Sequence, residues 1–257
     1  PAPAVRPPRI LALPEDGDQR AINSLLNKVT RSNFDRICQK ILESTSEENL
    51  APRVDAISLK SYDDPTTSEV MVDLLISLAA RGEQSLREEA ARLISGRARV
   101  REEDVEEEIS PVRGADPRDE YVAFCEEKKA KRSAILRGGV RASLASHILS
   151  SGGGVLGDAP HPDPPESILR AYSSVLSRAD SNEHRELLME CMLEILSRVK
   201  ARTPDDYPRL VSGGCLRDPY RDSEEVSPRY RFLASQIPLP ASPGGPDGAS
   251  ERPKRAR

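Results

Sequence analysis

Three histidines are the side chains of this sequence best suited to acid–base or metal chemistry, and none lies in a pattern that such chemistry needs. His147, His161 and His184 are far apart, and none has a second histidine at the spacing of a metal-binding helix. The glycine-rich segment 150–157 lacks the Gly-Lys-Ser/Thr ending of a phosphate-binding loop. The carboxylates fall in charge runs typical of exposed faces. The sequence therefore predicts a protein that is not an enzyme and that binds no metal or cofactor.

The cysteines and the lack of long apolar runs indicate the cellular compartment in which the protein is expected. Cys38, Cys125, Cys191 and Cys215 are too far apart in the sequence to form a metal-binding pair, and four in 257 residues are not typical of a secreted disulfide framework. No apolar run approaches the roughly 20 residues of a membrane span, and no signal-peptide pattern opens the chain. We expect a cytoplasmic protein without membrane contact. The basic C-terminal PKRAR would also fit a nuclear-localisation patch or a solubilising end.

A run of basic side chains could contact the phosphates of RNA: Lys128, Lys129, Lys131, Arg132, Arg137 and Arg141. The whole chain has 38 basic and 42 acidic residues and a net charge of -4, which argues against binding of nucleic acid by bulk charge alone. No aromatic residue lies among the six basic residues to stack on bases. A solvated helix face is the alternative interpretation, and the sequence leaves both open.

Helices must position these residues, because apolar side chains recur at spacings of three and four through most of the chain. This pattern predicts helices at residues 22–29, 32–42, 46–57, 67–80, 84–94, 119–148, 168–176, 188–199 and 223–237. No alternating pattern typical of β-strands is present. We therefore expect an all-α fold, an α-solenoid of stacked antiparallel helix pairs of the HEAT type.

Composition predicts how the chain is divided. Residues 1–17 and 241–257 are rich in Pro, Gly and charge, and we expect them to be disordered around a folded body at 18–240. Within the body, an acidic run followed by Pro111, Gly114 and Pro117 predicts a charged, mobile connection at about 96–118. Residues 203–222 have poor periodicity.

Two segments, LLNKVTRSNFDRI at 25–37 and SEENLAPRVDAISLKSYDDPTTSEVMVDLL at 46–75, resemble in order the opening and the second repeat of the middle domain of eukaryotic translation initiation factor 4G. EEKKAKRSAILRGGVR resembles the charged segment that leads into its glycine-containing helix, and SPRYRFLASQI at 227–237 its last helix. The family's Tyr-Ala in the second repeat is replaced here by Val70-Met71, and no cap-binding-subunit motif is present.

This resemblance implies a non-catalytic scaffold of translation initiation that binds a DEAD-box RNA helicase of the 4A type, with mRNA and other initiation factors as further partners. It also implies a helicase contact at Asn27, Lys28 and Thr30 and another at Arg231 and Phe232. A simple helix–turn–helix corner is the alternative for the first set. Phe34 lies on an apolar stripe and is expected in the core. A scaffold of mRNA splicing or nonsense-mediated decay, or an RNA-binding module, are the other interpretations.

Overall fold

The computed structural model of this chain describes residues 17–81, 84–110, 120–150, 163–212, 216, 218–220 and 223–237. These residues form helices and no strand, so the predicted all-α solenoid is confirmed. The N-terminal helices are α1 Gly17–Leu26, a short 3-10 turn η1 Arg31–Asn33, α2 Phe34–Ser44, α3 Glu47–Ser61, α4 Pro65–Arg81 and α5 Gln84–Arg97. They are followed by α6 Glu102–Ile109, α7 Glu120–Ser150, α8 Pro165–Arg178, α9 Asn182–Arg202, α10 Tyr207–Ser212 and α11 Pro228–Gln236.

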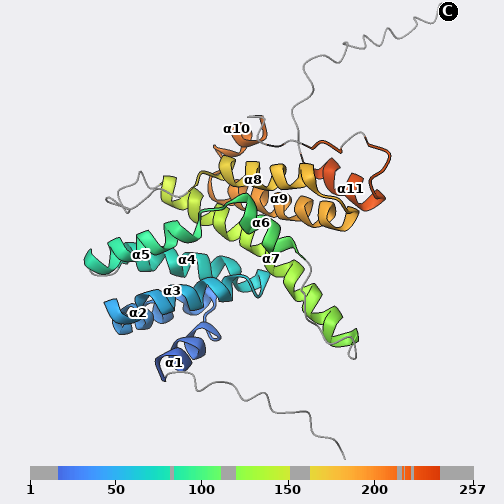
Figure 1. Cartoon of the computed structure of the whole chain (residues 1–257). Coiled ribbons are helices and arrows are strands. Elements are labelled where there is room, and N and C mark those ends of the chain that lie inside the picture. Colours follow the sequence, from blue (N-terminus) through green and yellow to red (C-terminus); the bar gives the residue numbers. More distant parts are fainter. Residues whose placement is uncertain are drawn as a thin grey trace, which may run out of the picture.

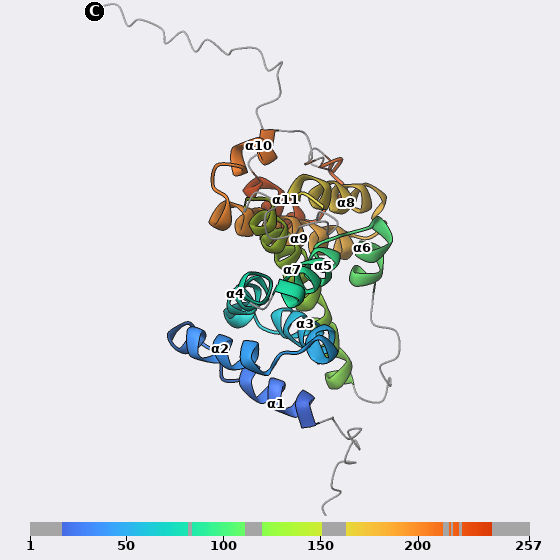
Figure 2. The same ribbon diagram turned by 90° about the vertical axis from the view of Figure 1, so that its left-hand side faces the viewer.

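The long helix α7 runs through the middle of the molecule and joins two stacks of helices (Figure 1). Helices α1–α5 lie on one side of it and α8–α11 on the other, and the view turned by 90° shows the same order (Figure 2). Helix α7 packs most extensively against α9 and also contacts α3, α4, α5 and α8. A single cluster of buried apolar side chains therefore extends from Ile22 in α1 to Ile237 after α11.

Two glycines in α7 permit its close approach to the C-terminal stack. A Cβ on Gly138 would lie 3.0 Å from the Tyr172 hydroxyl of α8 and 3.3 Å from Ile195 of α9. A Cβ on Gly139 would lie 2.7 Å from Cγ of Glu194. These glycines cost helix propensity, about 1 kcal/mol each relative to alanine, but they let the helix backbones pack more closely than a larger side chain would allow.

The prediction of a mobile connection at about 96–118 is wrong for its first part, up to residue 110. Helix α5 continues to Arg97, and α6 occupies Glu102–Ile109 and packs against α7 and α8. Val105 is fully buried and Ile109 packs on the core, four residues apart on one face. The high acidic content obscures this short apolar stripe in the sequence. Residues 111–119 lie outside the described part of the chain.

Several helix boundaries also differ from those predicted. The predicted helix start at Ser32 is instead the 3-10 turn η1, and α2 begins at Phe34. Helix α10 lies in the segment of poor periodicity, and α11 begins at Pro228 rather than at Ser223 because Ser227 caps it. Proline suits the first position of a helix, where its missing N–H would have no partner. The predicted disordered ends lie outside the described residues, except that Gly17 begins α1.

Candidate interaction surfaces

The corner between α1 and α2 is a rigid turn with exposed side chains. Val29 is buried and anchors the corner to the core. The Asn33 side chain closes it, since its Nδ2 donates to the Lys28 carbonyl at 2.8 Å and its Oδ1 accepts from the Thr30 amide at 2.7 Å. Asn27, Lys28 and Thr30 are exposed. The three residues expected to contact a helicase are therefore held on a fixed backbone and face solvent.

Helix α11 presents Arg231 and Phe232 on its outer face. The Ser227 hydroxyl caps the helix by accepting from the Tyr230 amide at 3.0 Å, and Tyr230 is fully buried. This orientation leaves Phe232 with 65% of its surface exposed. The Arg231 guanidinium donates to the Glu224 carbonyl at 3.0 Å, which holds it near the N-terminal end of the helix. An exposed phenylalanine beside an arginine is the composition typical of a contact anchor. Phe34, by contrast, packs on the core as expected.

The two surfaces lie far apart. Helix α1 is at one end of the molecule and α11 is in the stack at the other, in both views (Figures 1 and 2). The core that joins them is continuous, so the distance between the surfaces is set by packed helices and not by a linker.

The basic run on α7 divides into an exposed part and a paired part. Lys128 and Arg132 are exposed, and Lys129 lies 4.0 Å from Asp63. Lys131 pairs with Glu183 of α9, and this hydrogen bond lowers the pKa of the Glu183 carboxyl. The exposed lysines and arginine therefore stand among carboxylates, which reduces their attraction for phosphates.

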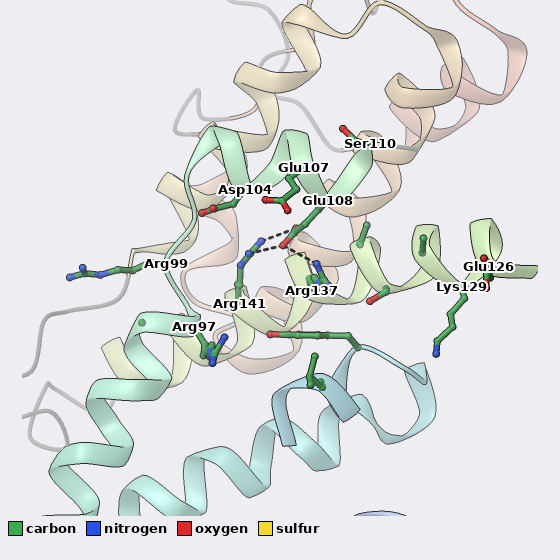
Figure 3. A pocket seen from close by; sticks show the side chains of 16 residues that line it. Arg97, Arg99, Asp104, Glu107, Glu108, Ser110, Glu126, Lys129, Arg137 and Arg141 are labelled. Atoms are coloured by element: carbon green, nitrogen blue, oxygen red, sulfur yellow. Dashed lines mark hydrogen bonds and ion pairs between the residues drawn. The ribbon is translucent and has the colours of Figure 1, made fainter. Parts of the chain in front are cut away.

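Arg137 and Arg141 belong instead to a nearly buried ion pair in a groove of about 930 Å³ (Figure 3). The Glu108 side chain is 8% exposed and receives two hydrogen bonds from Arg141, at 2.9 and 2.7 Å. Arg137 lies 3.6 Å from the same carboxylate, and its guanidinium stacks 5.3 Å from the centre of the Tyr62 ring. The Glu108 carboxylate therefore neutralises the charge of Arg141, which weakens the attraction of Arg141 for a phosphate.

Two groups in this groove, Arg141 and Tyr62, have a pKa that lies even further above neutral pH than usual. Burial alone would lower the pKa of Arg141, but the Glu108 charge offsets this and raises the pKa above its ordinary value. Burial raises the pKa of Tyr62 above its ordinary value of 10. Because neither group gives up a proton near pH 7, Arg141 and Tyr62 cannot serve as a general base there. The arrangement holds α6 to α7. In the sequence, Glu108 belongs to a run of acidic residues. Only its spacing from the apolar residues Val105 and Ile109 distinguishes it from its acidic neighbours.

In the described part of the chain, Cys38 and Cys191 are free and buried and Cys125 is free and exposed, while Cys215 lies outside that part. Burial raises the pKa of the Cys191 thiol well above its ordinary value. No cluster of three or more His, Cys, Asp or Glu in this part of the chain is arranged to hold a metal ion. None of its helices is both long and apolar enough to cross a membrane.

Comparison with known proteins leaves the family unassigned. No model of a known protein family matches this chain, and no curated protein sequence matches it.

Proposed function

We propose that this chain is a non-catalytic scaffold of translation initiation that binds a DEAD-box helicase of the 4A type and positions or stimulates it on mRNA. The observation that carries the proposal is the pair of exposed surfaces at opposite ends of one rigid solenoid, at Asn27–Thr30 and Arg231–Phe232. These are the residues that the resemblance to the initiation-factor middle domain implies as helicase contacts.

The mechanism follows from this separation. A DEAD-box helicase has two lobes that open and close, and a ligand shifts that equilibrium only if it binds one arrangement more tightly than the other. A scaffold that touched one lobe alone would have little such preference. Two patches at a fixed spacing favour the lobe arrangement that matches the spacing, and each patch alone need bind only weakly. No chemistry by the scaffold is required.

Binding to a purified 4A-type helicase, measured with and without nuclease, tests the proposal. Lys28→Glu with Thr30→Ala should weaken binding while the helical spectrum stays unchanged, because the closing hydrogen bonds use the backbone of both positions. Phe232→Ala should also weaken binding at unchanged stability, since the side chain is exposed. Leu59→Ala, an exposed apolar residue outside both patches, is the matched control.

Three results would count against this assignment. A folded Lys28/Thr30 variant that binds like the wild type would mean that the corner is only a turn. Binding that disappears with nuclease would indicate an RNA-binding module that uses the basic run. Selective capture of a helicase of splicing or decay from a helicase panel would favour a scaffold of those pathways.

A further inference from the structure

The first part of α7 extends beyond the body of the protein (Figure 1). It carries large apolar side chains that are exposed. Tyr121 is 75% exposed and Phe124 51%, and Val122 is exposed beside them. Along α7 the first buried side chain is Ala134 among the described positions. We call residues 121–132 the arm. Large apolar side chains gathered on one projecting segment mark a contact surface.

Aromatic and cationic side chains are sorted along one face of the arm. Tyr121, Phe124 and Lys128 follow at spacings of three and four residues, which places them on one side of the helix. Arg132, four residues further, continues the line. The aromatic side chains thus come first and the cations second. The Lys128 Nζ already lies 4.3 Å from the centre of the Phe124 ring, so these two residue types interact within the chain.

The same face leads into a groove of about 630 Å³ bordered by α7, α9 and α11. Phe124 and Arg132 of the arm line it, and Ile135 and Leu136 extend its apolar part toward the body. Its basic side chains stand opposite carboxylates of α9, among them Glu183 and Glu190. This balance of charge disfavours a polyanion such as RNA and fits an occupant that itself carries both apolar and mixed charged residues.

We propose that the occupant is the arm of a second copy of this chain, running antiparallel to the first. In this orientation the aromatic end of each arm lies against the cationic end of the other. Tyr121 then faces the partner's Arg132, and Phe124 faces the partner's Lys128, so each contact occurs twice about a twofold axis. The tip of each arm points toward the apolar part of the partner's groove. A parallel pair would instead set like charges side by side. This inference does not rest on the helicase proposal.

Sedimentation equilibrium of the full chain tests the arm pairing. Two short helices bury an area at the small end of specific interfaces, so we expect a weak monomer–dimer equilibrium, visible at concentrations up to about 0.5 mM. Phe124→Glu, and separately Lys128→Glu with Arg132→Glu, should each weaken association about tenfold or more. Leu149→Glu, at an exposed apolar position near the other end of the same helix, should leave it unchanged.

Cys125 provides a second readout, because it is exposed in the middle of the arm. In a Cys215→Ser background, a short bis-maleimide reagent should yield a covalent dimer with Cys125 and none when Cys125→Ser or Phe124→Glu is added. A wild-type chain that remains monomeric at the highest concentration overturns the proposal. So does a dimer that survives both sets of arm substitutions in variants with an unchanged helical spectrum.

Discussion

Glu108 shows at the scale of one residue why an acidic run need not be a solvated surface. Its carboxylate is almost removed from water and accepts both hydrogen bonds of a bidentate contact with Arg141, whose side chain is 12% exposed. Two charges in such a place interact strongly, yet taking both out of water costs a comparable amount. The pair therefore contributes less than its geometry suggests, while loss of one partner leaves the other charge buried and uncompensated.

Glu108→Gln should lower the free energy of unfolding by about 3 kcal/mol, because it leaves Arg141 buried beside a neutral side chain. Urea denaturation followed by circular dichroism measures this change. Glu107→Gln is the matched control, since Glu107 is the exposed neighbour in the same groove and should change stability by no more than about 0.5 kcal/mol. Equal stability of the two variants would show that the Glu108 carboxylate is hydrated in solution.

At the scale of one element, α7 combines two glycines, which are poor helix formers, with extensive packing at the same positions. Gly138 lies where α7 meets α8 and α9, whereas Gly96 of α5 has open space around the position of a Cβ. The two glycines therefore differ in whether a larger side chain would fit in their place. Gly138 is needed because neighbouring atoms occupy the volume a side chain would take, and Gly96 carries no such constraint.

Gly138→Val should lower the unfolding free energy by about 2 kcal/mol through overpacking against Tyr172 and Ile195, despite the removal of a glycine from a helix. Gly96→Ala should raise it by about 0.5 kcal/mol, because alanine loses less backbone entropy on folding. Thermal and urea unfolding of both variants check the two signs. A neutral or stabilising Gly138→Val would mean that α7 lies further from α8 and α9 than the structure shows.

At the scale of the whole molecule, a polar network ties the two stacks together across α7. Arg202 of α9 pairs with Glu69 and with Asp73 of α4, the latter at 2.8 Å. His147 of α7 is half-buried nearby. Burial, and then the charge of Arg202, lower the pKa of His147 below its ordinary value of 6.5. The folded protein therefore disfavours protonated His147 where the two stacks meet.

The lowered pKa of His147 predicts how the unfolding free energy changes with pH. Below the ordinary pKa of 6.5 the unfolded chain binds a proton at His147 that the folded chain resists, so the unfolding free energy should fall as the pH is lowered from about 7.5 to about 5.5. His147→Gln should remove part of this loss. Urea titrations of both proteins at the two pH values measure it. An unchanged pH slope in the variant would assign the dependence to other groups.

The spacing of apolar residues along the sequence was enough to predict most of the helices. Stripes such as Leu188, Cys191, Met192 and Ile195 repeat at 3.6 residues and have no polar interruption, so their helices are defined by neighbours in the chain. The resemblance to a known middle domain also pointed to Asn27, Lys28, Thr30 and Phe232, and the structure shows that these four side chains are exposed. Whether a helicase binds them stays a prediction.

Tertiary structure alone decided which charged residues pair with one another. Glu108 is 33 residues from Arg141 in the sequence, and Glu69 is 133 residues from Arg202, and no local pattern links such pairs. The same holds for Phe232 of α11, which is 65% exposed, whereas the apolar stripe of its own segment already predicted that Phe34 packs on the core. Periodicity states which side of a helix is apolar. Whether that side is covered depends on helices that arrive from elsewhere in the chain, because burial is a property of packed neighbours and not of the segment itself.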